Sequence, residues 1–171
     1  KNSKQEPGRV DLAFDQRFLS LAPEKTRLLR FSRFHTGMQN RFSFLGFEFH
    51  WSTDRAGERR LKRRTDRKKQ TRALKEFTDW VKRHRHLPTR EVFRQVRWKL
   101  RGHYNYFGLP GNGRGIREYH CHVLAILFKW LRRRNRRHGM NGWWFYALVD
   151  RLNLPHPRIV PYPRSRSIVL A

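Results

Sequence analysis

This 171-residue sequence is short of three features, and each shortage excludes a class of protein. Its single cysteine, Cys121, excludes an internal disulfide and any zinc site built from several cysteines. No apolar run reaches the roughly 18 residues of a membrane helix, and the first ten residues lack the apolar core of a signal peptide. We therefore expect a cytoplasmic protein with no membrane partner.

Acidic residues are also scarce. The sequence has 13 of them against 40 Lys and Arg, which gives a formal net charge of +27 and a pI of about 11.7. A compact chain with this charge repels itself unless a polyanion neutralises it. Nucleic acid is the favoured polyanion, because each neutralised phosphate releases condensed counterions. An anionic membrane surface is the rival, but no segment reads as the clean Trp/Leu face of an interfacial helix.

The stretch from Leu87 to Gly115 combines an amphipathic helix, a basic helix flank and a Tyr-Asn-Tyr-Phe block that ends in a glycine-rich turn. Val92, Val96, Leu100, Tyr104 and Phe107 follow at helical spacing, and this apolar stripe is expected in the core. Asn105 and Tyr106 fall off the stripe and are candidates to bond a 2′-hydroxyl or stack on a base. Guanidinium groups beside flat rings predict an RNA-binding surface.

The first part of the chain reads as short strands. Residues 19–21 and 27–31 are strand candidates, and residues 41–51 alternate strictly and are rich in aromatics, which predicts a further strand. Gly46 inside this last strand predicts the close approach of another backbone or side chain. So few strands need a partner layer.

The rest of the chain reads as helices. The first is expected over Glu58–His84, the second begins with Thr89 as its N-cap, the third runs from about Ile116 to His138, and a short fourth covers Trp143–Leu152. The first of them carries thirteen basic and three acidic residues between positions 59 and 85, so its first half must face solvent or a polyanion. The Pro-rich tail that follows cannot be helical.

Six blocks occur in a fixed order along the chain: LAPEKTRLLRF, FSFLGFEFHW, the long basic segment, RHLPTREVFRQVRWKLRGHYNYFG, FKWLRRRNRR and LPHPRIV. Together they resemble the C-terminal part of group II intron reverse transcriptase/maturases, from about residue 19 to 164. The similar region of that family is the end of the polymerase palm followed by the thumb, the maturase-specific domain X.

The resemblance implies a mainly α fold, a three- to four-helix thumb/maturase bundle preceded by short antiparallel β elements. It implies a poorly ordered or truncated leader at 1–18, palm β elements at 19–54, the helical domain at 55–154 and an extended Pro/Arg-rich tail at 155–171. The residues before Phe14 do not match the family, as though the chain began inside a truncated palm. Gly115 is another departure, since the family more often has a Ser-type helix cap there.

The resemblance also implies a function, which is to bind and stabilise folded group II intron RNA for splicing; an RNA/DNA hybrid is a further partner. The alternative is a part of an RNA-directed DNA polymerase. Polymerisation needs clustered carboxylates that hold two metal ions, and no two of the six aspartates of this chain are adjacent, so we expect no activity from the chain alone. No cofactor is expected beyond Mg²⁺ for the RNA or for a complete polymerase. A generic basic nucleic-acid-binding protein is a third interpretation.

The RNA-contacting residues expected from these patterns are basic residues on the predicted helix flanks, together with the two residues that leave the apolar stripe. They are Arg59, Arg60, Lys62, Arg63, Arg67, Lys68, Arg94, Arg97, Arg101, Asn105, Tyr106, Arg114, Arg132, Arg133 and Arg136. No catalytic or metal-binding residue is predicted. Consecutive His120, Cys121 and His122 point about 100° apart on a helix and cannot converge on one ion.

Overall fold

The computed structural model describes residues 31, 32, 34, 41–134 and 139–160. This part of the chain is mainly helical with one small antiparallel sheet, as predicted. Its elements, in chain order, are β1 (Arg41–Phe44), β2 (Phe47–Thr53), β3 (Arg59–Thr65), α2 (Arg67–His84), α3 (Thr89–Phe107), α4 (Gly113–Arg134) and α5 (Gly142–Arg151). The strand candidates at 19–21 and 27–31 lie outside the described residues, except for Phe31.

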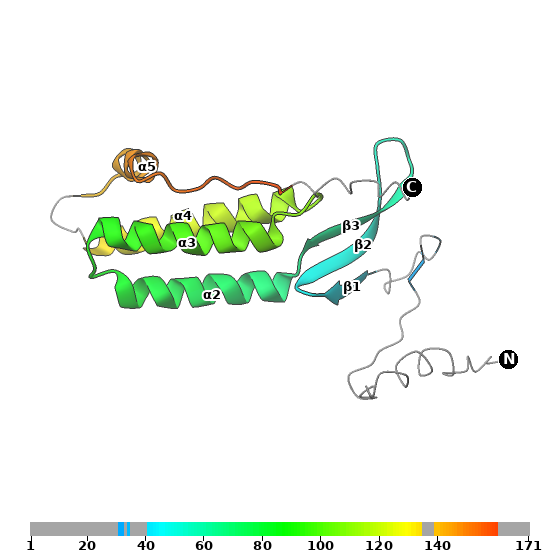
Figure 1. Cartoon of the computed structure of the whole chain (residues 1–171), viewed down its shortest axis with the longest axis horizontal. Helices are drawn as coiled ribbons and strands as arrows, with labels where there is room; N and C mark the ends of the chain where they lie inside the picture. Colours follow the sequence, from blue (N-terminus) through cyan, green and yellow to red (C-terminus); the bar gives the residue numbers. More distant parts are fainter. Residues whose placement is uncertain (1–30, 33, 35–40, 135–138, 161–171) are drawn as a thin grey trace, which may run out of the picture.

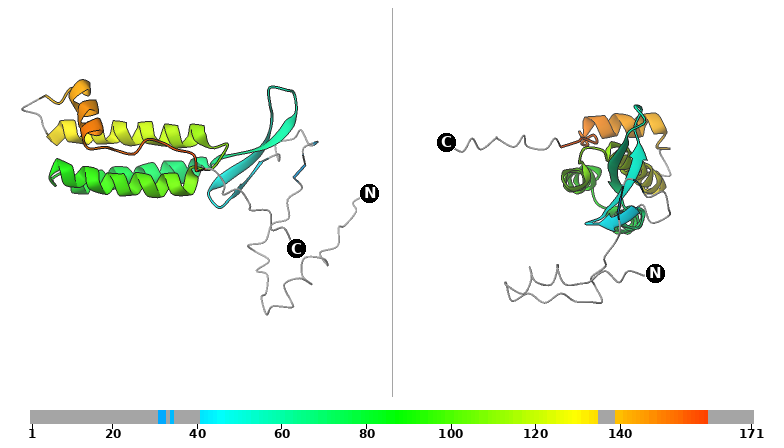
Figure 2. Two further views of the ribbon diagram at one scale, coloured as in Figure 1. Left: turned by 45° about the horizontal axis from the view of Figure 1, so that its top comes forward. Right: turned by 90° about the vertical axis from the view of Figure 1, so that its right-hand side faces the viewer.

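Helices α2, α3 and α4 lie lengthwise beside one another, and the sheet extends from one end of this bundle (Figures 1 and 2). Helix α5 lies across the other end, and the segment after it runs back along the bundle toward the sheet. This returning segment ends on the α3–α4 connection, where the backbone N–H of Val160 donates to the carbonyl oxygen of Gly108 at 2.6 Å. The two ends of the bundle are therefore linked by an extended strap.

Strands β1 and β2 form a hairpin, so the expectation of one strand over residues 41–51 is wrong. Its two turn residues, Leu45 and Gly46, have φ values of 48° and 78°, the left-handed values that a type I′ turn requires. Phe44 pairs with Phe47 across the turn. Because two residues are used in the turn, the alternation changes phase and brings all the aromatic side chains of the hairpin to one face: Phe42, Phe44, Phe47, Phe49 and Trp51.

Strand β3 corrects the prediction of a helix from Glu58. Residues 59–65 pair antiparallel with β2, and the helix begins only at Arg67. Asp66 makes the switch, because its carboxylate accepts a hydrogen bond from the backbone N–H of Lys69 at 3.1 Å and caps α2. Leu61 is the one apolar residue of β3, so hydrophobic periodicity carried no signal for a strand here.

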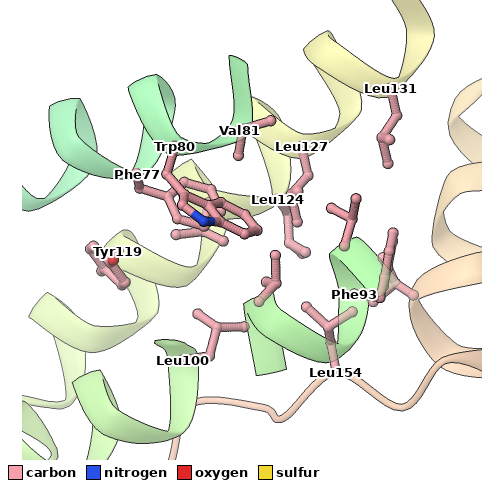
Figure 3. Packing of buried hydrophobic residues seen from close by; sticks show 14 of the residues in the cluster. Phe77, Trp80, Val81, Phe93, Leu100, Tyr119, Leu124, Leu127, Leu131 and Leu154 are labelled. Carbon is pink, nitrogen blue, oxygen red and sulfur yellow. The ribbon is translucent and has the colours of Figure 1, made fainter. Parts of the chain in front are cut away.

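The core lies between α2, α3 and α4 (Figure 3). The stripe predicted for α3 is confirmed for Val92, Val96, Leu100 and Tyr104, which are all at most 1% exposed, whereas Phe107 at its end is half-buried and packs against the core. Each such apolar side chain stabilises the fold by roughly 1.5 to 3 kcal/mol when fully buried. Leu154, in the segment after α5, also reaches this cluster, so the strap is part of the core.

Two helix starts differ from the sequence-based expectation. Pro88 occupies the cap position of α3 and Thr89 is its first helical residue, without a side-chain cap bond. Helix α4 begins at Gly113, three residues before the expected Ile116, so Gly115 lies inside the helix and is not its cap. The predicted end of α4 near His138 lies outside the described residues.

Asn112 joins the sheet to the bundle just before α4. Its side-chain Oδ1 accepts from the backbone N–H of Thr65 at 2.9 Å, and its Nδ2 donates to the Thr65 hydroxyl and to the carbonyl oxygen of Phe107, both at 2.8 Å. Asn112 and Thr65 are both buried. A Cβ on Gly115 would lie 2.5 Å from Asn112 Oδ1, so only glycine fits beside this junction.

Candidate nucleic-acid interface

The expected RNA-contacting residues are spread over both ends of the molecule. Arg59, Arg60, Lys62 and Arg63 lie on β3, Arg67 and Lys68 begin α2, Arg94, Arg97, Arg101, Asn105 and Tyr106 lie on α3, and Arg114, Arg132 and Arg133 lie at the two ends of α4. Arg136 lies outside the described residues. The structure thus does not bring all of them to one patch.

On the sheet, strand alternation divides the basic residues between two faces. Lys62 pairs with His50 of β2, and Arg64 pairs with Glu48, so both cations lie on the face opposite the aromatic rings. Glu48 Oε1 lies 2.7 Å from Arg64 Nη2 and 3.7 Å from Arg41 Nη1. Burial, followed by the charge of Arg64, lowers the pKa of His50, so its imidazole adds no charge near neutral pH.

Several predicted cations are already engaged by protein groups. The Arg60 Nε lies 2.6 Å from Asp54 Oδ2, and the Arg63 Nε donates to the carbonyl oxygen of Pro110 at 3.2 Å. These bonds shape the β2–β3 turn and hold β3 against the α3–α4 connection. By contrast, Lys62 forms no ion pair or hydrogen bond with any other described residue and stands exposed.

The basic start of α2 surrounds a carboxylate that caps the helix. Ser43 donates its hydroxyl to Asp66 Oδ2 at 2.5 Å, and this hydrogen bond is the main reason why the pKa of Asp66 is lowered. Arg67 and Lys68, which follow directly, are exposed. The guanidinium of Arg67 has no ion-pair or hydrogen-bond partner in the described part of the chain.

The predicted arginines of α3 differ in whether they are bonded to other protein groups. Arg94 Nη2 lies 2.8 Å from Glu91 Oε1, and its guanidinium lies 5.2 Å from the centroid of the Trp98 ring. Arg97 is half-buried and donates to the main-chain carbonyl of Leu152, which closes the C-terminal end of α5. Arg101, one turn later, is exposed and makes no such bond with the described residues.

Tyr106 and Asn105, which were expected to stack on a base or bond a 2′-hydroxyl, also contact other parts of the protein. Tyr106 donates its hydroxyl to the carbonyl oxygen of Leu45 at 2.9 Å, and its ring stacks on Phe47 with 6.0 Å between centroids. Asn105 Oδ1 accepts from Arg158 Nη2 at 3.4 Å. Tyr106 thus joins α3 to the β1–β2 turn, although its side chain is 52% exposed.

The end of the bundle away from the sheet brings together the predicted Arg133 and two cations that the sequence analysis did not predict, Lys82 and Arg85. All three surround the half-buried ring of Trp130: Lys82, Arg85 and Arg133 lie 5.7, 5.1 and 4.9 Å from its centroid. Arg133 follows Trp130 by three residues on α4, so the sequence alone places these two side chains on one helix face. Lys82 of α2 and Arg85, its C-cap, come beside them only when the chain folds. We call this group the Trp130 cluster.

Arg134 fixes the backbone beside the Trp130 cluster. Its Nη1 donates to the carbonyl oxygens of Arg85 and Leu87, at 3.0 and 2.5 Å. These carbonyls belong to the end of α2 and the connection to α3, where unpaired acceptors collect. Arg134 therefore holds the α2–α3 connection against α4 and keeps Arg85 close to Trp130.

Three of the described histidines, His84, His103 and His120, contact other groups of the bundle. His84 Nδ1 contacts the carbonyl oxygen of Trp80 at 2.9 Å, and His120 Nδ1 contacts the Tyr104 hydroxyl at 2.6 Å in the core. His103 stacks on Tyr119 with 3.6 Å between ring centroids, and burial lowers the pKa of His103 to about 4. No group of three His, Cys, Asp or Glu side chains gathers as a metal site within the described residues.

Comparison of the chain with protein-family models, curated proteins and solved structures gives no significant match. Among the described helices, none has the length and apolar character needed to span a bilayer. The described surface is cationic at both ends of the bundle, with Lys62 and Arg67 exposed at the sheet end and three cations around Trp130 at the other.

Proposed function

We propose that the chain binds folded RNA through its cationic surface, and that this RNA is a group II intron, as the maturase-like sequence blocks imply. The Trp130 cluster is the observation that carries the proposal. Three cations gather around one ring, and Asp79, 3.2 Å from Lys82, is the one carboxylate in contact with them among the described residues. Cations that gather around one ring with a single carboxylate among them favour the binding of an anion such as a phosphate.

The charge of the whole chain supports a polyanion over a single small anion. Even if each of the 13 carboxylates neutralised one cation, 27 basic side chains would remain. Residues at the sheet end, Lys62, Arg67 and Arg101 among them, are exposed without a bonded partner in the described part of the chain. An extended ligand can reach both these residues and the Trp130 cluster, whereas a mononucleotide cannot.

In this proposal the protein stabilises the RNA and does not perform the splicing chemistry. The bundle supplies a rigid frame, because its three long helices share one core and the strap ties α5 back to the sheet end. Phosphates on separate parts of a folded RNA would then be held at fixed positions relative to one another. A maturase needs to hold phosphates in this fixed arrangement, since the RNA must keep one fold while it reacts.

Salt dependence of RNA binding tests the proposal. Neutralising about 6 to 10 phosphates makes affinity for a folded intron RNA fall by orders of magnitude between about 50 and 200 mM salt. Fluorescence anisotropy with labelled RNA measures this slope. An affinity that does not change with salt contradicts the proposal.

A matched pair of variants tests the Trp130 cluster. The double change Arg85→Gln and Arg133→Gln removes the two cations of the cluster that have no carboxylate partner among the described residues, and it should weaken RNA binding and reduce the salt slope. The control is Arg72→Gln, which removes a guanidinium that lies 2.8 Å from a carboxylate oxygen of Glu76. The control should lose less affinity per charge removed, because Arg72 is already paired.

Two alternatives make different predictions. If the chain is part of an RNA-directed DNA polymerase, its metal-binding carboxylates must come from elsewhere, and this chain alone will not extend a primer with Mg²⁺. A generic basic nucleic-acid-binding protein would show no preference for folded intron RNA over random duplex at about 0.2 M salt. A preference for the folded intron RNA at that salt favours the maturase proposal.

A further inference from the structure

Helix α5 exposes aromatic rings that the fold does not need. Residues 143–146 read Trp-Trp-Phe-Tyr, and successive side chains on a helix point about 100° apart. Phe145 alone of the four is buried, at 2% exposure, whereas Trp143, Trp144 and Tyr146 are 73, 64 and 59% exposed. We call these three rings the α5 aromatic face.

The opposite side of α5 packs against the bundle and holds the helix in place. Phe145 packs against Phe128 of α4 with 5.2 Å between ring centroids, and Val149 is buried one turn later. The start of the helix is capped by Asn141, whose side chain accepts from the backbone N–H of Trp144 at 2.9 Å. The α5 aromatic face is therefore unexplained by core packing, and large exposed apolar groups that gather on one side mark a contact surface.

Positive charge lies beside the α5 aromatic face. Arg151 follows Trp144 by seven residues, two helical turns, and so shares its side of α5, where it is exposed. A guanidinium for phosphates thus lies on the same side of the helix as rings for bases.

We infer that the α5 aromatic face binds unpaired nucleobases of an RNA strand, while Arg151 lies along its phosphates. The inference rests on the proposed RNA-binding function and adds a site for single-stranded segments. Trp143 and Trp144 are 5.8 Å apart and nearly perpendicular, at 84°, so they offer two separate surfaces and not one stacked pair. Base stacking on such rings tolerates any sequence, because every base has a π-face.

Other occupants fit the surroundings less well. A second copy of the chain would bring another net charge of +27 to the same surface. An interfacial membrane helix needs a broad apolar side of its own, but Phe145 and Val149, which would supply it here, are buried against the bundle. An RNA strand matches both the rings and the guanidinium of Arg151 on the same side of the helix.

Binding of an oligouridine of about 12 nucleotides tests the inference, with a duplex RNA of similar length as the second ligand. The variant Trp143→Ala/Trp144→Ala should lose at least about 10-fold in affinity for oligouridine and keep its affinity for the duplex. Trp143→Phe/Trp144→Phe should retain most of the oligouridine affinity. Tryptophan fluorescence of the wild type should be quenched by oligouridine, and less in the double alanine variant.

Trp98 provides the matched control. It is an exposed tryptophan, 58% exposed, on α3. Trp98→Ala should bind oligouridine as the wild type does. Circular dichroism melts of all variants should coincide, since none of the substituted rings is buried.

Each other outcome overturns the inference. If the double alanine variant binds oligouridine as tightly as the wild type while folded RNA still binds in a salt-dependent way, the α5 site is wrong and the proposed function stands. If the wild type binds no RNA, both fail. Base stacking at α5 is ruled out if the double alanine variant loses the same affinity for oligouridine and for the duplex. It is also ruled out if Trp98→Ala loses as much oligouridine affinity as the double alanine variant. If the double alanine variant keeps its oligouridine affinity but no longer self-associates, the α5 aromatic face binds a second copy of the chain. If it keeps that affinity but no longer binds phosphatidylcholine/phosphatidylserine vesicles, the face binds a membrane.

Discussion

The side-chain amide of Asn112 binds both the backbone N–H and the hydroxyl of Thr65, at 2.9 and 2.8 Å. A residue just before α4 thus provides hydrogen-bond partners for Thr65 at the end of β3, 47 positions earlier in the chain. Both residues are buried, so water cannot replace either bond. This junction sets the direction in which the basic β3 strand leaves the bundle.

Replacing Asn112 with Ala should lower the free energy of unfolding by about 2 to 4 kcal/mol, because the buried backbone N–H and hydroxyl of Thr65 both lose their partner. Urea denaturation followed by circular dichroism measures the change. Asn105→Ala is the control, since that side chain is exposed and makes one long contact, 3.4 Å to Arg158. A loss below about 0.5 kcal/mol for Asn112→Ala would show that the junction does not hold the sheet.

Gly115→Ala should also destabilise the fold, by about 1 to 3 kcal/mol, since the added Cβ would lie 2.5 Å from Asn112 Oδ1 and 3.2 Å from Thr65 Oγ1. Gly102→Ala is the matched helical control, with no atom within 4 Å of the new Cβ. It should stabilise by about 0.5 to 1 kcal/mol, because alanine loses less backbone entropy in a helix. Thermal melts of the two variants should therefore move in opposite directions.

Arg97 and Arg101 should separate stability from RNA binding. Arg97→Ala removes the bond to the Leu152 carbonyl and should lower the free energy of unfolding by about 1 to 2 kcal/mol, with little effect on the salt slope of RNA binding. Arg101→Ala should leave stability within about 0.5 kcal/mol and reduce that slope by about 1. The reverse result would mean that Arg97, and not Arg101, faces the RNA.

His103 should make the fold sensitive to acid. Burial lowers its pKa from 6.5 to about 4, so the unfolded chain takes up a proton below about pH 6.5 that the folded chain refuses. Stability should therefore fall as pH drops through this window, by on the order of 1 to 2 kcal/mol at about pH 5. Urea titrations of the wild type and of His103→Phe measure it.

The phenylalanine variant isolates the contribution of His103, because it keeps an aromatic ring against Tyr119 and removes the imidazole. Other groups, such as His120, whose pKa is also lowered by burial, remain in both proteins. The variant should lose less stability than the wild type over the same pH range. Identical pH profiles would place the imidazole of His103 in contact with water.

Local pattern was enough to predict the long helices. Leu100 and Tyr104 were expected in the core from their spacing and are buried, because the 3.6-residue period places them on one side of α3. The same reasoning could not find β3, where Leu61 is the sole apolar residue. Nor could it find the hairpin turn, because Leu45 is an unusual residue for a positive φ.

The site was less predictable than the core. Charge alone identified the basic residues, but it could not say that Arg97 binds a carbonyl of the α5 C-terminus or that Tyr106 reaches Leu45. Those partners lie 55 and 61 positions away in the sequence. The Trp130 cluster has the same origin, since its cations come from α2, the end of α2 and α4.

The sequence by itself determined the excess of positive charge and the apolar stripes of α3 and α4, because charge and helical spacing are local properties of the chain. Tertiary structure decided which cations are already bonded, which surround Trp130, and which rings of α5 face solvent. The reason is physical: a guanidinium or an indole has no fixed partner until folding brings distant groups within contact distance, and the same residue type then either supports the fold or stays exposed to bind a ligand.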